Sequence, residues 1–189
     1  MPLNVLLLGP QGAGKGTQAK RISAEYSIPH IASGEILRSE MDAGTDLGQR
    51  VKETIERGDL VSDDLMIELI RNRLEQTDTE AGFVLDGFPR TIVQAEALDS
   101  MFADIGRNFN VAFALQIPDE VAFDRLRRRA RADDTDEAIQ RRLDNYHRET
   151  EPLIEFYRTR GNVVPIHANR SENEVFAEIS RALEQVPAA

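Results

Sequence analysis

Short runs of consecutive apolar residues alternate along the chain with longer stretches in which apolar residues recur every three or four positions. The short runs are typical of strands buried on both faces, as in a parallel sheet covered by helices. Pro165 lies within the last run and cannot donate a hydrogen bond to a neighbouring strand, so this run is expected at an edge of the sheet. The runs span residues 4–8, 28–32, 83–86, 111–117 and 163–166.

The longer stretches predict helices, and two of them have clear starting signals. Apolar residues recur at helical spacing from Leu65 to Leu74, after Ser62 as a candidate N-cap and two aspartates in the first turn. A second pattern runs from Val175 to Leu183, preceded by Ser171 and Glu174 at capping-box spacing. Strands that alternate with helices predict an α/β fold, a doubly wound five-stranded parallel sheet with helices on both faces.

Two segments are expected to be irregular. Arg131 to Glu137 is the most polar stretch and predicts a mobile loop. Pro187-Ala188-Ala189 is expected to be a frayed tail.

Composition narrows the possible functions. The length of 189 residues suits one domain, and the net charge of −10 argues against binding to nucleic acid or to an anionic membrane. The absence of cysteine excludes disulfides, thiolate zinc clusters and cysteine nucleophiles, and it fits a reducing cytoplasm. The apolar run Val5–Leu8 is too short for a signal sequence or a membrane span. His30, His147 and His167 lack metal-ligand spacing and are expected to be structural or on the surface.

A glycine-rich loop between the first strand and a helix carries the strongest chemical signal. Its glycines allow backbone N–H groups to turn inward around an anion, and the following helix adds the positive end of its dipole. Lys15 can reach the β- and γ-phosphates of a nucleoside triphosphate. The alternative is a glycine-rich turn with a surface lysine, and the loop alone does not distinguish ATPase, GTPase and kinase. The candidate phosphate-binding residues are Gly12, Ala13, Gly14, Lys15, Gly16 and Thr17.

The order Gly14-Lys15-Gly16-Thr17-Gln18 departs from the usual loop, in which Ser or Thr follows the lysine directly. In this the chain resembles the nucleoside monophosphate kinases, and the adenylate kinases in particular. The resemblance implies the P-loop NTPase fold, with a helical flap over the acceptor nucleotide and a lid over the donor.

The segment from Ser33 to Arg38 resembles the acceptor-site segment of that family. Ser33 can cap a helix and bind a ligand, and Arg38 offers a planar fork for a phosphate. An ordinary N-capped surface helix is the alternative for this segment. The turn Gly58 to Ser62 resembles a second family segment, in which the backbone and the valine face the base of the monophosphate, here at Asp59, Leu60 and Val61. Residues 32–61 would then form the flap.

Asp86 follows three apolar residues, as expected of a strand that delivers a carboxylate to Mg²⁺. We expect Thr17 and Asp86 to hold the Mg²⁺ of MgATP, through waters, and we expect no zinc. If a helix begins near Pro89, Arg90 and Gln94 share one face, so that Arg90 holds a phosphate while the Gln94 amide meets an adenine edge. A capped helix start with a buried aspartate is the alternative.

Base preference is also indicated by resemblance. Uridylate-cytidylate kinases tend to carry asparagine near Gln94 and alanine at the position of Ser33. Both positions in this chain therefore favour AMP.

Arginines gather in the last third of this acidic chain. The ordinary interpretation is a solvated, salt-bridged helix face, and it is preferred for Arg127, Arg128 and Arg141. Phosphoryl transfer between two nucleotides needs several converging cations on an element that excludes water. By resemblance, Arg129 contacts the ATP phosphates, Arg131 and Arg142 reach the transferring phosphate, and Arg125 is a fourth. The lid is expected to be a short, metal-free loop over residues 129–139.

These arguments predict three overlapping sets of residues. The catalytic set is Lys15, Asp86, Arg90, Arg125, Arg129, Arg131 and Arg142. The ATP-binding set is Gly12, Ala13, Gly14, Lys15, Gly16, Thr17 and Arg129, with Arg170 through its backbone. The AMP-binding set is Ser33, Arg38, Asp59, Leu60, Val61, Gly87, Phe88, Pro89, Arg90, Gln94, Arg131 and Arg142.

The resemblance spans essentially the whole chain and implies an adenylate kinase activity, MgATP plus AMP giving two ADP, in a cytoplasmic monomer. The core would comprise residues 1–31, 62–128 and 140–189. A kinase acting on UMP, CMP or GMP is the nearest alternative, and a nucleotide sensor without turnover is a second. A plain ATPase leaves the acceptor-site arginines unexplained.

Overall fold

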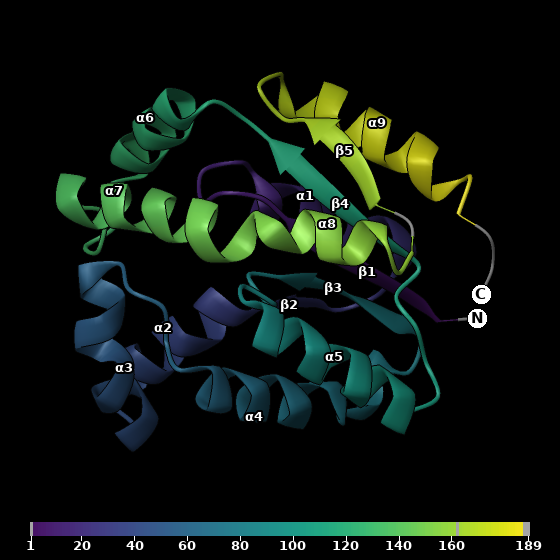
Figure 1. Ribbon diagram of the computed structural model, residues 1–189, viewed down its shortest axis with the longest axis horizontal. Coiled ribbons are helices and arrows are strands. Elements are labelled where there is room, and N and C mark those ends of the chain that lie inside the picture. Colours follow the sequence, from purple (N-terminus) through teal and green to yellow (C-terminus); the bar gives the residue numbers. More distant parts are fainter. Residues whose placement is uncertain (1, 162, 187–189) are drawn as a thin grey trace.

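A parallel β-sheet forms the centre of the protein (Figure 1). The computed structural model describes residues 2–161 and 163–186, so the expected tail 187–189 lies outside it. Within the described residues, five parallel strands run in the order β2-β3-β1-β4-β5. This confirms the predicted fold class, and it puts the strand containing Pro165 at an edge, as expected. The strands are β1 (Leu3–Leu8), β2 (His30–Ala32), β3 (Gly82–Asp86), β4 (Val111–Gln116) and β5 (Val163–His167).

Helices cover both faces of this sheet. Alternate residues of β1 point to opposite sides: Val5 and Leu7 pack with α1 and α9, whereas Leu6 and Leu8 pack with α4, α5 and α8. The helices are α1 (Lys15–Tyr26), α2 (Ser33–Ala43), α3 (Asp46–Arg57), α4 (Asp63–Leu74), α5 (Ile92–Asp104), α6 (Asp119–Arg129), α7 (Asp136–Asn145), α8 (Pro152–Arg158) and α9 (Glu172–Leu183). A 3₁₀ turn over Thr77–Thr79 precedes β3, and a π-helical turn over Tyr146–Thr150 joins α7 to α8.

The starting signals of the helices have mixed outcomes. The capping box of α9 is present, with the Ser171 side chain accepting from the backbone of Glu174 and the Glu174 side chain accepting from the backbone of Ser171. Ser62 occupies the N-cap position of α4, but its side chain makes no capping hydrogen bond. The helix expected near Pro89 begins later, at Ile92, with Thr91 as its N-cap. Arg90 and Gln94 therefore do not share a helical face, because Arg90 precedes the helix.

Two helix pairs stand at one end of the sheet, where the strands finish (Figure 1). The first is α2 with α3, which pack so closely that a Cβ at Gly48 would lie 2.1 Å from the carbonyl oxygen of Glu40. The second is α6 with α7, joined by residues 130–135 and packed around Leu126 and Leu143. The predicted loops over 129–139 and over 131–137 are both too long. Arg129 still belongs to α6 and residues 136–139 to α7, because Thr135 caps α7 by accepting from the backbone of Ala138.

Candidate active site

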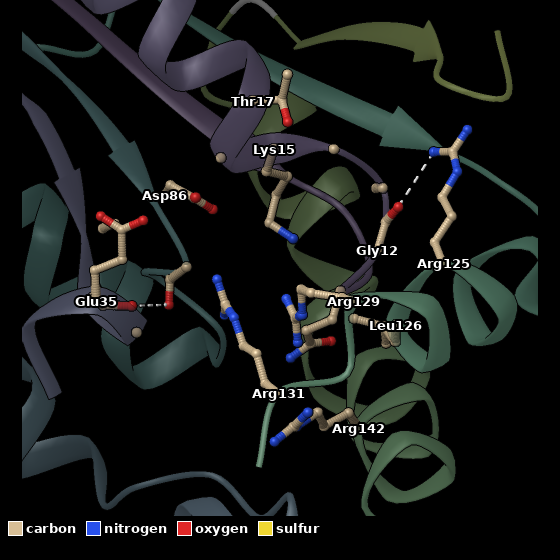
Figure 2. A pocket seen from close by; sticks show the side chains of 18 of the residues that line it. Gly12, Lys15, Thr17, Glu35, Asp86, Arg125, Leu126, Arg129, Arg131 and Arg142 are labelled. Carbon is tan, nitrogen blue, oxygen red and sulfur yellow. Dashed lines mark hydrogen bonds between the residues drawn. The ribbon is translucent and has the colours of Figure 1, made fainter. Parts of the chain in front are cut away.

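A cavity of about 700 Å³ opens between the phosphate loop, the α2–α3 pair and the α6–α7 pair, beyond the carboxyl end of β3 (Figure 2). Ligand sites of parallel α/β sheets lie at this end of the strands. Of the predicted site residues, all line the cavity except Phe88 and Pro89. Phe88 was predicted to bind AMP together with its neighbour Gly87, but its side chain is buried in the core, at 1% exposure.

The loop between β1 and α1 has the geometry that its glycines predict. Gly12 and Gly14 adopt positive φ angles of 86° and 90°, and a Cβ at Gly12 would lie 2.8 Å from the carbonyl oxygen of Ala122. The Lys15 ammonium donates to the carbonyl oxygens of Gly9 at 2.7 Å and Pro10 at 2.9 Å. The lysine is thus held across the loop that it is expected to serve.

Burial lowers the pKa of Lys15 from 10.5 to about 8, although the charge of Asp86 opposes the shift. Arg90 and Arg129 lower the pKa further, since neighbouring positive charges disfavour a third. Burial, with a smaller contribution from the two arginines, thus weakens the hold of Lys15 on its proton.

Asp86 ends β3, opposite Leu7 of β1 and Ala32 of β2 in the sheet register. Burial acts to raise the pKa of Asp86, but the polar contact with His30 and the charge of Lys15 outweigh it, so the pKa lies below the usual value. His30 Nε2 is 3.5 Å from Asp86 Oδ2, which is longer than a well-formed hydrogen bond. An ionised carboxylate is the kind of oxygen ligand that fits Mg²⁺.

Gly16 is the loop residue whose side-chain position faces this carboxylate. A Cβ at Gly16 would lie 3.5 Å from Asp86 Oδ2, so glycine leaves room beside the aspartate. Thr17 and Asp86 both line the cavity, from α1 and from β3. A cation bound between the loop and β3 would lie beside the negative charge of Asp86.

The ends of β2 and β3 are tied together by one carbonyl oxygen. Gly87 O accepts from Ser33 Oγ at 2.8 Å and from Arg90 Nε at 2.8 Å. The expectation that Ser33 caps a helix is wrong: Ala32 occupies the N-cap of α2 and Ser33 is its first residue. The Ser33 hydroxyl instead fixes the start of α2 to the segment that carries Arg90.

Three of the arginines that line the cavity, Arg38, Arg90 and Arg131, have no carboxylate partner within the described residues. Burial lowers the pKa of Arg90, and burial together with the charge of Arg131 lowers the pKa of Arg38. Across residues 2–161 and 163–186, none of Arg38, Arg90 and Arg131 has a carboxylate oxygen within 4.0 Å. Clustered, partly desolvated cations of this kind are suited to an anion with several charges.

Gln94 is 2% exposed and has a fixed orientation. Its Oε1 accepts from the backbone N–H of Arg90 at 2.8 Å, and its Nε2 donates to Asp63 Oδ1 at 2.8 Å. An amide group has two donor hydrogens and two acceptor lone pairs, so one of each remains.

Arg129 and Arg142 meet on one carboxylate in the connection between α6 and α7. Asp134 accepts from Arg129 at 2.9 and 2.7 Å and from Arg142 at 2.8 Å. Arg142 also forms an ion pair with Asp133 and donates to the carbonyl oxygen of Ile55, at the end of α3, at 3.4 Å. A residue of the α6–α7 pair thus contacts the α2–α3 pair directly.

Arg125 lies apart from these arginines (Figure 2). Its guanidinium donates to the carbonyl oxygens of Gly12 at 3.3 Å and Ala168 at 3.2 Å, which ties the phosphate loop to the segment after β5. The Arg170 side chain turns away to the carbonyl oxygen of His167 and to Glu178 on α9. Both residues line the cavity.

A family model described as adenylate kinase matches residues 7–162 of this chain. The chain belongs to the adenylate kinase family. It is 44% identical to an adenylate kinase of Cyanothece sp. over 186 residues, covering 96% of this chain and 95% of the relative. An adenylate kinase of Xanthomonas euvesicatoria pv. vesicatoria is 42% identical over 185 residues, with 96% and 99% covered. One from Methanosarcina barkeri is 38% identical over 213 residues, with 97% and 99% covered.

Some residues that contact the predicted site residues were not themselves predicted. Asp63, Asp134 and His30 were not among the predicted site residues, although each contacts one of them. Only the pattern Arg131-Ala132-Asp133-Asp134 hinted at an acidic partner for the arginines. None of the described helices is long and apolar enough to cross a membrane.

Proposed function

We propose that this chain transfers a phosphoryl group reversibly from MgATP to AMP, giving two ADP. The proposal rests on one observation: a phosphate loop with Lys15 and a separate group of unpaired arginines, Arg38 and Arg90, line one cavity. A nucleotide hydrolase needs the first of these features only. Two phosphate-binding groups in one cavity fit a reaction between two nucleotides, and the family membership agrees with this.

The donor triphosphate is assigned to the phosphate loop. Backbone N–H groups of residues 12–17 would surround its phosphates, with Lys15 supplying charge to the β- and γ-phosphates. Bound Mg²⁺ would neutralise charge on the same phosphates, and Asp86, with Thr17 nearby, is the residue to hold it through waters. Arg129 is assigned to the donor phosphates. Arg170 would contact the donor base through its backbone.

The acceptor monophosphate is assigned to the opposite wall. Arg38 and Arg90 would bind its phosphate, and Arg90 is already oriented through its bond to Gly87 O. The base would lie between the turn over residues 59–61 and Gln94, near Ser33. The Gln94 amide retains one donor and one acceptor, which match the N1 acceptor and the 6-amino donor of adenine.

Transfer itself needs positioning and charge more than covalent chemistry. Arg131 and Arg142 would neutralise the charge that develops on the transferring group, and no general base is required because the acceptor phosphate is ionised. Arg125 was assigned to this group, but its bonds to Gly12 O and Ala168 O support a positioning role behind the donor site instead.

Closure of two segments would exclude water. We assign the flap to residues 32–61 and the lid to residues 129–139, moving on a core of residues 1–31, 62–128 and 140–189. Arg142, at the edge of the core, pairs with Asp133 and Asp134 of the lid and donates to Ile55 O of the flap, which supports coupling between flap and lid. We further propose that the enzyme is a cytoplasmic monomer that binds neither nucleic acid nor membranes, in keeping with its net charge of −10.

Initial rates with MgATP as donor and AMP, UMP, CMP or GMP as separate acceptors test the proposal. We expect nucleoside diphosphate formation with AMP to be far faster than with the others. Preference for a pyrimidine would overturn the assignment of the base pocket, and ATP binding without turnover on any acceptor would indicate a sensor.

Lys15→Met should abolish nearly all turnover while leaving the fold intact. Lys20→Met is the control, because Lys20 lies five residues further along α1 and its exposed ammonium pairs with Glu35, at 3.5 Å. Equal loss in both variants would show that the effect is not specific to the phosphate loop.

A further inference from the structure

The start of α4 makes an unexpected contact with the wall of the acceptor site. Asp63 Oδ1 accepts two hydrogen bonds, from Thr91 Oγ1 at 2.9 Å and from Gln94 Nε2 at 2.8 Å. Asp63 is the first residue of α4, whereas Thr91 is the N-cap of α5 and Gln94 lies in its first turn. This carboxylate therefore joins the two helices at the side chain assigned to the acceptor base.

The two ends of the Gln94 amide face partners that cannot exchange roles. The backbone N–H of Arg90 can only donate, so the atom at 2.8 Å from it must be the amide oxygen. A carboxylate oxygen can only accept, so the atom that faces Asp63 must be the amide nitrogen. The orientation of Gln94 is thus fixed by chemistry at both ends.

An unrestrained glutamine would not distinguish purines that differ only at N1 and C6. Adenine presents an amino donor and an N1 acceptor, whereas hypoxanthine presents an O6 acceptor and an N1–H donor. Rotating the amide by half a turn exchanges its oxygen and nitrogen and suits the second pattern as well as the first. Discrimination therefore requires that the amide be prevented from turning.

We infer that Asp63 is a positioning residue that sets purine specificity by locking the Gln94 amide in the orientation that accepts a 6-amino group and rejects a 6-oxo group. Turning the amide with Asp63 present would place its oxygen against the carboxylate and its NH₂ against the Arg90 N–H. With Asp63 removed, only the second of these penalties remains, and the side chain can also rotate away. The inference rests on the proposed AMP site and extends it to the choice among purines.

Binding measurements test this independently of turnover. Calorimetry with AMP and with inosine monophosphate, which carries the 6-oxo base, gives the ratio of the two dissociation constants. We expect Asp63→Ala to reduce this ratio at least about tenfold, the discrimination supplied by one hydrogen bond to a charged group. The kcat with saturating AMP should stay near that of the unmodified enzyme, because the phosphate-binding arginines are untouched.

Three variants make the result specific. Asp63→Asn keeps the size of the side chain, but its amide can itself turn and donate to a turned Gln94, so this variant should also lower the ratio. Asp64→Ala removes the neighbouring, exposed acid from the same helix turn and should leave the ratio unchanged. Asp63→Ser retains a polar side chain at the helix start but is too short to reach Gln94, so it replaces Asp63→Ala if that variant is unstable.

An unchanged ratio in Asp63→Ala or Asp63→Ser overturns the inference, as does an equal loss of affinity for both nucleotides, which marks a purely structural role. Equal affinity of the unmodified enzyme for the two nucleotides overturns it as well. Absence of turnover with AMP would instead count against the proposed function, and the binding ratio would still decide the role of Asp63.

Discussion

Arg142 donates a 2.8 Å hydrogen bond to Asp134, whose side chain is completely shielded from solvent although it lies in the short connection between α6 and α7. The same carboxylate binds Arg129 and accepts from the backbone N–H of Arg131 at 3.1 Å. Burial acts to raise the pKa of Asp134, but these hydrogen bonds outweigh it and the pKa lies below the usual value. One ionised group thus organises three arginines assigned to the phosphates.

Asp134→Ala should therefore reduce both stability and activity. The largely buried Arg142 and the partly exposed Arg129 lose their shared partner, so we expect the free energy of unfolding to fall by about 1–3 kcal/mol. The kcat/KM for AMP should fall at least about tenfold, because the arginines lose their fixed positions. Urea denaturation and initial rates measure the two effects.

Asp136→Ala provides the control for this prediction. Asp136 belongs to the same segment, but its pair with Arg127 is 3.6 Å long and both side chains are more than half exposed. Exposed pairs contribute about 0–1 kcal/mol, so this variant should resemble the unmodified protein. Equal effects of the two substitutions would contradict a special role for Asp134.

Binding of MgATP should weaken above about pH 8. The pKa of Lys15 lies near 8 because burial disfavours its charged form, so the free enzyme loses this positive charge as the pH rises through that value. We expect the dissociation constant for MgATP to rise toward a limit of about tenfold per pH unit for a strictly required proton. Calorimetric titrations between pH 7 and about 9.5 would measure it.

Lys15→Met should show weak binding at every pH and no comparable rise. Lys20→Met should behave as the unmodified enzyme does, since its ammonium is exposed. A pH dependence that survives in Lys15→Met would assign the titrating group elsewhere.

Gly58 lies where the end of α3 meets α7, and it is expected to tolerate no side chain. Its φ angle is 80°, and a Cβ there would lie 2.5 Å from the carbonyl oxygen of Ala138. Asn145 Nδ2 donates to Gly58 O at 3.2 Å across the same contact. We expect Gly58→Ala to lower the free energy of unfolding by about 2–4 kcal/mol and to raise the KM for AMP, because the turn that follows lines the acceptor site.

Gly44→Ala separates steric overlap from backbone strain. Gly44 also has a positive φ angle, 65°, but its Cβ position meets no atom within 4 Å. Its cost should be limited to about 1–2 kcal/mol, with no change in the KM for AMP. If both variants behave alike, the contact between α3 and α7 has no functional role.

His147 should make stability depend on pH near neutrality. Hydrogen bonds to Glu151, at 2.8 Å, and to Asp119, at 2.9 Å, raise the pKa of His147 above 6.5. Its stabilising contribution is complete below pH 6.5, where the folded and unfolded states are both protonated, and it is lost as the pH rises through the raised value.

Thermal unfolding of the unmodified protein and of His147→Gln between pH 5.5 and about 8.5 tests this sign. The difference in melting temperature should be largest at the acidic end and should shrink as the pH rises. A constant difference across the range would show that the imidazole contributes without changing its charge.

Features that depend on residues close together in the chain could be predicted from the sequence alone. Buried apolar runs predict the strands, Pro165 predicts an edge, and Ser171 with Glu174 predicts a capping box, because each signal acts within a few residues through backbone geometry. The phosphate loop belongs to the same class, since its glycines and Lys15 are contiguous. The resemblance to adenylate kinases followed from such local segments in the right order.

The contacts that hold the site's side chains in place could not be predicted in this way. Asp63 meets Gln94 across 31 residues, Arg142 meets Ile55 across 87, and Arg125 meets Gly12 across 113. No local pattern encodes such pairs, because they depend on where whole helices pack on the sheet. The start of α5 shows the same limit. Thr91 is the N-cap, so Arg90 precedes the helix and does not share a helical face with Gln94. Gln94 instead accepts a hydrogen bond from the backbone N–H of Arg90.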